Sequence, residues 1–288
     1  METLNQCDIC PHMCVIHPGE TGFCCARGVS AESSGDNTKR TVPVVFSLSY
    51  GKLTSIALDP IEKKPLHHFH QGSVILSVGS FGCNLKCPWC QNHNISMAGE
   101  GDVQTHEVTP ETLAVIAEQY VPEGNIGVAF TYNEPLINFE YVRDTSKILK
   151  EKGLKSVLVT NGYANPVYFD ELLPFVDAMN IDLKGIDDDL YKQIGGDLET
   201  VTRNIRSAAG RCHLEITCLL INGVNDSLRE MEELTDFVAS VSSEIPLHIS
   251  RFFPRNKFKD KTPTSIESMK QFEEIARRKL KHVSLGNV

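Results

Sequence analysis

The sequence has no apolar run that approaches the roughly 18 residues needed to cross a membrane, and its first residues, METLNQCDIC, lack the apolar core of a signal peptide. We therefore expect a cytoplasmic protein without a membrane partner. The sequence also lacks a basic excess, because 28 lysines and arginines face 37 aspartates and glutamates, for a net charge of −9. A chain with this balance has no general positive field to attract nucleic acid, so a nucleic-acid partner is not expected.

Cysteine, in contrast, is abundant and unevenly distributed. Of ten cysteines in 288 residues, eight fall in two groups. In a chain with no sign of secretion, such cysteines serve metal or redox chemistry more often than they form disulfides. The two groups are therefore the first candidates for functional sites.

From residue 73 onward, apolar strand patterns alternate with helical patterns. Thr109, Pro110 and Glu111 have the residue types of a helix start, and Ser227 begins another helical pattern. This alternation predicts an α/β fold with a parallel sheet. A complete eightfold barrel takes about 250 residues, whereas residues 73–288 number 216, so we predict a partial (β/α)6 TIM-type barrel. An open doubly wound sheet is the alternative. The strand candidates are residues 73–79, 126–130, 156–160, 178–184, 213–221 and 246–250.

Residues 1–72 predict a different organisation. Residues 7–28 are rich in cysteine, proline and glycine, and residues 30–40 are typical of a polar connection. Two strand-like runs, residues 42–49 and 53–59, are separated by a short turn and predict a β-hairpin. We therefore expect a small cysteine-rich segment with a β-hairpin at 1–72, ahead of a barrel at 73–288.

The stretch GCNLKCPWCQN places Cys83, Cys87 and Cys90 directly after the first predicted barrel strand. The carboxyl ends of the strands form the mouth where barrel enzymes carry their active sites. Three thiolates at this spacing reach three irons of a [4Fe–4S] cluster and leave the fourth iron without a protein ligand. A structural zinc would need a fourth ligand, such as His93 or a distant residue. The loop therefore favours a cluster that keeps one position open for a small molecule.

At these residues the sequence resembles the radical S-adenosylmethionine (SAM) superfamily, in which the open iron binds the amino and carboxylate groups of SAM. More narrowly, DPIEKKPLHHF, SVGSFGCNLKCPWCQN and the N-terminal cysteines are similar to the AmmeMemoRadiSam radical SAM enzymes. The resemblance covers nearly the whole chain. Further segments follow in the order seen in the branch that contains pyruvate formate-lyase activating enzyme: TYNEP (131–135), VTNGY (159–163), NIDLKG (180–185), LEITCLLINGVND (214–226) and HISRFFP (248–254).

This resemblance implies an oxidoreductase that cleaves SAM reductively at a [4Fe–4S] cluster and forms a 5′-deoxyadenosyl radical. An electron donor of the flavodoxin or ferredoxin type is the implied partner. A non-catalytic iron–sulfur or electron-transfer protein is an alternative, but it leaves the polar residues of TYNEP and NIDLKG without a role.

Several polar residues are candidates for contacts with SAM. Strand alternation places Asp182 and Lys184 on one face, where they are suited to a ribose diol and a carboxylate, respectively. A salt bridge between the two is the alternative. The resemblance implies that Trp89 lies beside adenine, although packing within the loop also explains it, and Glu134 is the candidate for the ammonium group. The other candidates are Asn133, Thr160, Asn161 and His248, of which Thr160 and Asn161 also fit a plain turn.

Glu215 and Arg251 are the predicted substrate contacts, at positions suited to a carboxylate-bearing molecule. Protein activators of this branch commonly carry a ferredoxin-like insertion after the three-cysteine loop, but residues 91–125 contain no cysteine. We therefore expect a substrate other than a glycyl radical enzyme. Activation of such an enzyme is the alternative.

The N-terminal cysteines form a second candidate metal site. Cys7, Cys10, Cys14 and Cys24 are enough for a four-coordinate metal. Zinc and an auxiliary iron–sulfur cluster use the same thiolates, so the spacing leaves both open. A structural role is the simplest, because metal often holds core-poor segments together.

Overall fold

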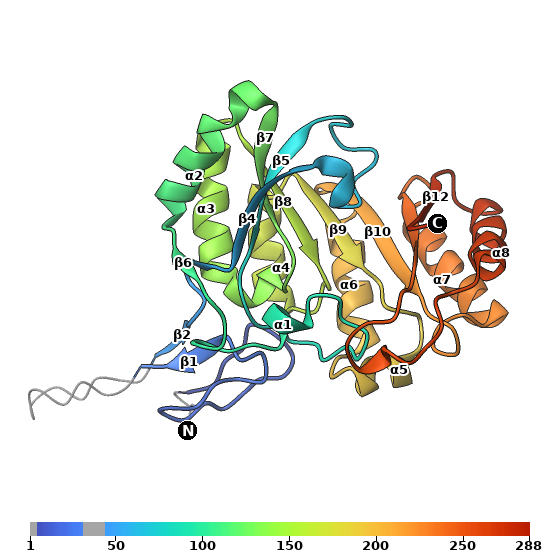
Figure 1. The fold of residues 1–288 in the computed structure, drawn as a ribbon, viewed down its shortest axis with the longest axis horizontal. Coiled ribbons are helices and arrows are strands. Elements are labelled where there is room, and N and C mark those ends of the chain that lie inside the picture. Colours follow the sequence, from blue (N-terminus) through green and yellow to red (C-terminus); the bar gives the residue numbers. More distant parts are fainter. Residues whose placement is uncertain (1–4, 31–43) are drawn as a thin grey trace, which may run out of the picture.

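The computed structural model describes residues 5–30 and 44–288, and its centre is an eight-stranded sheet (Figure 1). The strand order is β12-β11-β10-β9-β8-β7-β5-β4, parallel throughout except for β4, which is antiparallel to β5. The strands are β4 (Ser55–Pro60), β5 (Val74–Gly79), β7 (Asn125–Phe130), β8 (Lys155–Thr160), β9 (Ala178–Asp182), β10 (His213–Leu220), β11 (Leu247–Arg251) and β12 (Val283–Gly286).

The six predicted barrel strands correspond to β5 and β7 through β11, and each joins the sheet beside the strand that precedes it. A doubly wound sheet would reverse its strand order at a switch point. The sequential order therefore confirms the predicted partial barrel, to which β12 adds one more parallel strand at the edge.

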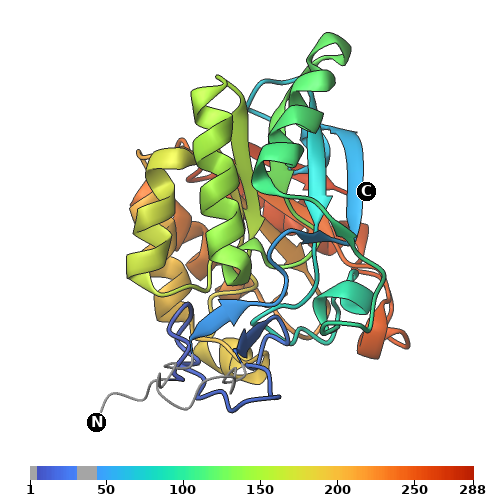
Figure 2. The same cartoon turned by 90° about the vertical axis from the view of Figure 1, so that its left-hand side faces the viewer.

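Helices cover the outer face of the sheet (Figure 2). Thr109 caps α2 by accepting a hydrogen bond from the Thr112 amide, and Pro110 occupies the first turn, as predicted. Ser227 caps α7 in a reciprocal capping box with Glu230. The helices are α1 (His93–Ser96), α2 (Pro110–Gln119), α3 (Phe139–Glu151), α4 (Pro166–Leu172), α5 (Asp188–Gln193), α6 (Leu198–Ala208), α7 (Leu228–Val241) and α8 (Ile266–Arg277), with 3₁₀ turns η1 (Ile61–Lys63), η2 (Val121–Glu123), η3 (Pro135–Asn138), η4 (Leu173–Phe175) and η5 (Asn256–Phe258). Within the described residues, none of these helices has the length and apolarity required to span a bilayer.

The predicted β-hairpin differs from the pairing in the structure. The first run supplies β2 (Val45–Ser47), which pairs antiparallel with β1 (Arg27–Val29), while the second supplies β4, which pairs with β5. Between them, β3 (Lys52–Leu53) pairs with β6 (His106–Glu107). The outer edge of β5 presents unpaired backbone groups, and β4 satisfies them, which explains why the second run joins the large sheet. The polar connection predicted at 30–40 lies outside the described residues from residue 31 on.

The N-terminal segment packs at the end of the sheet where the cysteine loop and α1 lie (Figures 1 and 2). The Cys83 amide donates to the Cys24 carbonyl at 3.2 Å, and the Asn165 amide donates to the Ile9 carbonyl at 2.9 Å. Parallel strands bring all their carboxyl ends to this same end of the sheet. Both cysteine groups, far apart in the sequence, therefore meet there.

Candidate active site

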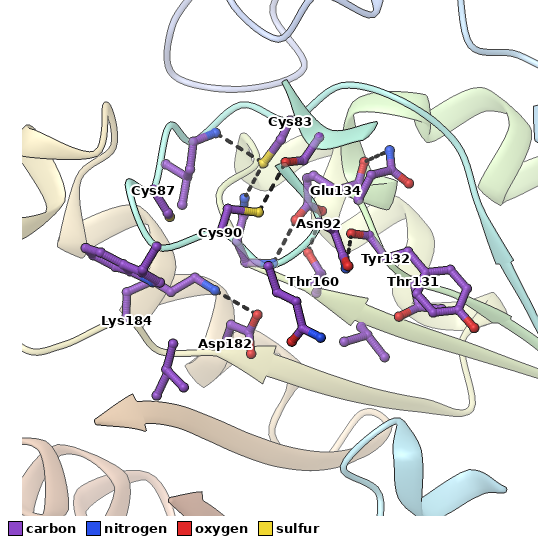
Figure 3. A pocket seen from close by; sticks show the side chains of 18 of the residues that line it. Cys83, Cys87, Cys90, Asn92, Thr131, Tyr132, Glu134, Thr160, Asp182 and Lys184 are labelled. Carbon is purple, nitrogen blue, oxygen red and sulfur yellow. Dashed lines mark hydrogen bonds and ion pairs between the residues drawn. The ribbon is translucent and has the colours of Figure 1, made fainter. Parts of the chain in front are cut away.

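A cavity of about 300 Å³ opens at the carboxyl ends of the parallel strands (Figure 3). The cysteine loop forms one side, and Asp182 and Lys184 lie on the other. The cavity thus gathers residues from the loop after β5 and from the ends of β7 through β11. Ten predicted site residues line it: Cys83, Cys87, Trp89, Cys90, Asn133, Glu134, Thr160, Asn161, Asp182 and Lys184.

The three thiols of the loop face this cavity as free cysteines. Cys83 Sγ accepts from the Leu85 amide at 3.4 Å, and Cys90 Sγ lies 3.2 Å from the Ser96 hydroxyl. Burial raises the pKa of Cys83 well above its usual value, and burial raises that of Cys87 to about 11 although the Lys184 charge acts in the opposite direction. Without a metal the thiols of Cys83 and Cys87 are protonated at neutral pH, so metal binding must displace their protons.

The segment TYNEP holds the cysteine loop in place. Asn133 Oδ1 accepts from the Ser80 amide at 2.9 Å, and its Nδ2 donates to the Phe81 and Gly82 carbonyls, both at 3.1 Å. Asn92 Nδ2 donates to the Tyr132 carbonyl at 2.8 Å. Two neighbouring residues of TYNEP therefore fix both ends of the loop, and the amide of Asn133 is engaged with the protein itself.

Glu134 is a fully enclosed carboxylate at the wall of the cavity. It accepts hydrogen bonds from the Leu136 amide at 2.9 Å, the Thr160 hydroxyl at 2.6 Å and the Asn161 amide at 2.7 Å. Burial raises the pKa of Glu134 to about 7 against these bonds. Asn161 Nδ2 also lies 3.7 Å from Cys83 Sγ. The three predicted residues Glu134, Thr160 and Asn161 thus form one hydrogen-bonded unit behind the cysteine loop.

Asp182 and Lys184 both line the cavity and form an ion pair with an Nζ–Oδ2 distance of 2.7 Å. Burial disfavours the ammonium form of Lys184, but Asp182 and Cys87 outweigh this and raise its pKa. Beside the pair, the Thr217 hydroxyl is buried and has no hydrogen-bond partner among the described residues. The cavity therefore offers a charge pair that can exchange partners and one unused hydroxyl.

Glu215 and His248 do not line this cavity, contrary to the roles predicted for them. Glu215 is fully buried and accepts from the backbone amides of His67 and His68 at 3.1 and 2.8 Å. The ring nitrogens of His213 and His248 lie 2.8 and 2.5 Å from its two oxygens. Both predicted residues lie nearer the amino ends of β10 and β11, where Glu215 anchors the segment before β5.

The prediction missed polar residues two positions further along the same strands. Thr217 follows Glu215 on the same face of β10, and Ser250 follows His248 on β11, and both line the cavity. Strand alternation was the signal that pointed to them. Gln91, Asn92, Ser96, Thr131, Tyr132 and Asn287 also line it and carried no sequence signal beyond their neighbourhood to the motifs.

The four N-terminal cysteines surround a small cavity of about 10 Å³ of their own. The Phe23 amide donates to Cys14 Sγ at 3.4 Å. Burial raises the pKa of Cys10 to about 12 and of Cys24 to about 11, while hydrogen bonds from the backbone at His12 and Ala26 act in the opposite direction. Among the described residues, no three histidine, cysteine, aspartate or glutamate side chains are arranged to hold a metal ion. A single ion at these cysteines would therefore require the thiols to turn toward it.

A model of the radical SAM superfamily matches residues 77–238, which is more than half of the chain. An uncharacterized protein of Methanocaldococcus jannaschii is 37% identical over 287 residues, covering 98% of this chain and 81% of that protein. A pyruvate formate-lyase-activating enzyme of Clostridium pasteurianum is 34% identical over 116 residues, which cover 40% of this chain and 48% of the enzyme. The alignment thus spans about half of that enzyme.

Among solved structures, a radical SAM methyltransferase from Sphaerobacter thermophilus aligns with a TM-score of 0.57 and 21% identity, over 75% of this chain and 67% of that one. This likeness supports the partial-barrel fold. The family match confirms the resemblance to the radical SAM superfamily that the sequence motifs carry. The chain belongs to the radical SAM superfamily, a family of enzymes that use an iron–sulfur cluster and SAM, and is related to pyruvate formate-lyase activating enzymes.

Proposed function

We propose that this chain is a radical SAM oxidoreductase whose cluster is held by Cys83, Cys87 and Cys90. The observation that carries the proposal is that all three thiols line one cavity whose opposite side carries Asp182 and Lys184. The donor set fits the cofactors, because three thiolates are the ligands of an open [4Fe–4S] cluster. The cavity adds a charge pair and the Thr217 hydroxyl, which has no hydrogen-bond partner in the described part of the chain. When bound, the reduced cluster and SAM supply a 5′-deoxyadenosyl radical that abstracts hydrogen from a substrate.

In this proposal the residues around the cavity bind and orient SAM. Asp182 accepts hydrogen bonds from the ribose diol, and Lys184 turns from Asp182 to a carboxylate, so the 2.7 Å ion pair exchanges partners on binding. Trp89 is buried in the cavity wall and provides an apolar face for adenine. Burial raises the pKa of Glu134 to about 7, so the carboxyl group is partly ionised at neutral pH. An ammonium group that approaches it favours the ionised form.

The chemistry is tested by anaerobic incubation of the iron-loaded protein with SAM and dithionite. Release of 5′-deoxyadenosine and methionine is expected, and both products, together with bound iron, should be lost when Cys83, Cys87 and Cys90 are replaced with alanine. Cys212→Ala is the matched control, because Cys212 belongs to neither cysteine group. Cleavage at the wild-type level in the triple variant would contradict the assignment, and an iron-loaded protein that never cleaves SAM would favour the binding-protein alternative.

We further propose that the substrate is not a glycyl radical enzyme and that a flavodoxin- or ferredoxin-type donor delivers the electron. No cysteine lies between residues 91 and 125, where protein activators of this branch commonly carry their insertion. Arg251 adjoins the cavity and is suited to an anionic small molecule. The test is to follow deuterium transfer into 5′-deoxyadenosine from labelled metabolites and from labelled glycyl radical enzymes. A glycine-centred radical in a partner protein, without transfer from metabolites, would establish the alternative.

We also propose that Cys7, Cys10, Cys14 and Cys24 hold a second metal, either zinc or an auxiliary iron–sulfur cluster. All four line one cavity, and backbone amides donate to their sulfur atoms, an arrangement that stabilises thiolates. Replacing the four with alanine is expected to remove one metal species and to lower the thermal midpoint, because a metal bound only to the folded state stabilises it. Elemental analysis identifies zinc or iron, and unchanged metal content would show that these are free thiols.

A further inference from the structure

A second cavity of about 260 Å³ adjoins the candidate active site. The two cavities share four lining residues, so they are neighbours with a common wall. The shared residues are Trp89, Gln91, Leu219 and Asn287, and the second cavity is completed by Arg251, Phe252, Phe253 and Arg255. A molecule that extends from the first cavity past Trp89 would therefore enter the second.

The second cavity carries positive charge without a matching negative charge. Arg251 donates from Nε to the Thr264 carbonyl at 2.8 Å, and its guanidinium lies 4.9 Å from the centre of the Phe253 ring. In the part of the chain that the structure describes, no acidic side chain lines the cavity. Within residues 5–30 and 44–288, neither Arg251 nor Arg255 forms an ion pair with a carboxylate. Among the described residues, the lining of this cavity is therefore locally positive in a protein of net charge −9.

The segment that carries Arg255 is attached to the cysteine loop. The Lys257 amide donates to the Pro88 carbonyl at 3.0 Å, and the Phe258 ring lies 5.6 Å from Trp89. Arg251 stands at the end of β11, inside the main sheet. Both arginines are therefore held by elements that also shape the larger cavity.

We propose that the second cavity binds an anionic group of the substrate, a carboxylate or a phosphate, through Arg251 and Arg255. A guanidinium presents parallel N–H donors that match the paired oxygens of these groups. Phe253 then covers the adjacent apolar part of the molecule, and the reacting carbon extends into the larger cavity. This inference rests on the proposed function, because it assigns the substrate class for that site.

The test measures anion binding directly and does not depend on turnover. Anaerobic, iron-loaded protein is dialysed to equilibrium against labelled pyrophosphate or labelled malonate at fixed ionic strength, with and without SAM. We expect one of the two probes to bind with saturation, and Arg251→Gln and Arg255→Gln each to weaken it at least tenfold. Among the described residues, Arg255→Gln removes no side-chain hydrogen bond or ion pair of the fold, which keeps the test informative if Arg251→Gln is unstable. Lys259→Gln is the matched control, because Lys259 belongs to the same basic run, RNKFKDK, but does not line the cavity.

The outcomes separate the two proposals. Binding that is lost in both arginine variants and kept within twofold in Lys259→Gln supports the inference, and the probe that binds identifies phosphate or carboxylate. Equal losses in all three variants would indicate a diffuse basic surface for an acidic macromolecule and would overturn it, as would no saturable binding of either probe. If wild-type protein cleaves SAM but binds neither probe, only this inference fails. If it binds a probe through the arginines but never cleaves SAM, only the proposed function fails.

Discussion

The adjacent lysines Lys63 and Lys64 both form an ion pair with the carboxylate of Asp59, but the Lys63 side chain is exposed and the Lys64 side chain is buried. Lys63 Nζ lies 3.1 Å from Asp59 Oδ1 with its side chain 66% exposed, and Lys64 Nζ lies 2.9 Å from Oδ2 with its side chain 3% exposed. The Tyr132 hydroxyl donates to the same Oδ2 at 2.7 Å, and the Lys64 ammonium lies 4.7 Å from the centre of the Tyr132 ring. Replacing each lysine with methionine keeps most of the apolar stem and removes one charge, so burial is the main difference between the two variants.

We expect Lys64→Met to lower the free energy of unfolding by about 3 kcal/mol, the low end for breaking a buried ion pair, because Asp59 keeps Tyr132 and Lys63 as partners. Lys63→Met removes an exposed pair and should cost about 0.5 kcal/mol or less. Burial raises the pKa of Asp59, but hydrogen bonds from Tyr132 and both lysines outweigh it and hold the pKa well below the usual range. The carboxylate thus stays ionised at neutral pH and needs its buried partner.

Urea unfolding measures the free energy of unfolding of both variants. If only stability has changed, the urea midpoint shifts and the dependence of the free energy on urea concentration stays the same. The double variant Asp59→Asn/Lys64→Met should lose at least about 1 kcal/mol less free energy of unfolding than the two single variants lose together, because the ion pair is lost only once. Equal effects of the two lysine substitutions, or strict additivity in the cycle, would refute the reasoning. The network also bears on the site, because the Tyr132 carbonyl anchors Asn92 beside the cysteine loop.

Three other predictions concern the groups that support the site. Burial raises the pKa of Glu215, but its hydrogen bonds with His213 and His248 outweigh this and lower the pKa to about 2, so the stabilisation that Glu215 provides is present above the usual value near 4.3 and is lost as pH falls toward 2. In urea unfolding, the free energy of unfolding should differ between pH 5 and pH 3 by about 2 kcal/mol more in wild type than in Glu215→Gln. Gly82→Ala would place a Cβ 2.5 Å from the Cys24 carbonyl oxygen, whereas Gly101→Ala has a similar positive φ and no atom within 4 Å, so only the former should reduce the iron retained after gel filtration. Asn133→Ala removes the bonds that hold residues 80–82, and elemental analysis should show less bound iron although every cysteine remains.

The parallel sheet was predictable because short apolar runs, most clearly those of β5, β7 and β8, alternate with helical patterns along the chain. Burial on both faces requires such runs in a parallel sheet, and local composition is enough to locate them. The pairing of β1, β2, β3 and β6 was not predictable in the same way. These strands are two or three residues long, and their partners are set by tertiary packing.

The sequence predicted which side chains share a face of the sheet, but not how far along each strand the cavity lies. Alternation correctly grouped Glu215 with Thr217 and His248 with Ser250, since side chains two apart point the same way. Two residues also correspond to a rise of about 6.6 Å along a strand, and nothing in the sequence tells which member of a pair reaches the cavity. Polar character favoured the glutamate and the histidine, yet those two satisfy each other inside the sheet while the smaller hydroxyls line the cavity.

The contact between the two cysteine groups could not be read from the sequence at all, and it changes how the N-terminal segment is understood. Cys24 and Cys83 are 59 positions apart, yet the carbonyl of one accepts from the amide of the other at 3.2 Å. The two sulfur atoms, Cys24 Sγ and Cys83 Sγ, are connected through this hydrogen bond and the few covalent bonds on either side of it. The summed bond lengths limit the Sγ–Sγ distance to less than about 14 Å. A metal at the N-terminal cysteines would thus lie next to the loop proposed to hold the cluster, and its identity decides its role there. Zinc at the N-terminal cysteines would only hold the cysteine loop in place. An iron–sulfur cluster there would also be placed to pass an electron to the cluster proposed at Cys83, Cys87 and Cys90.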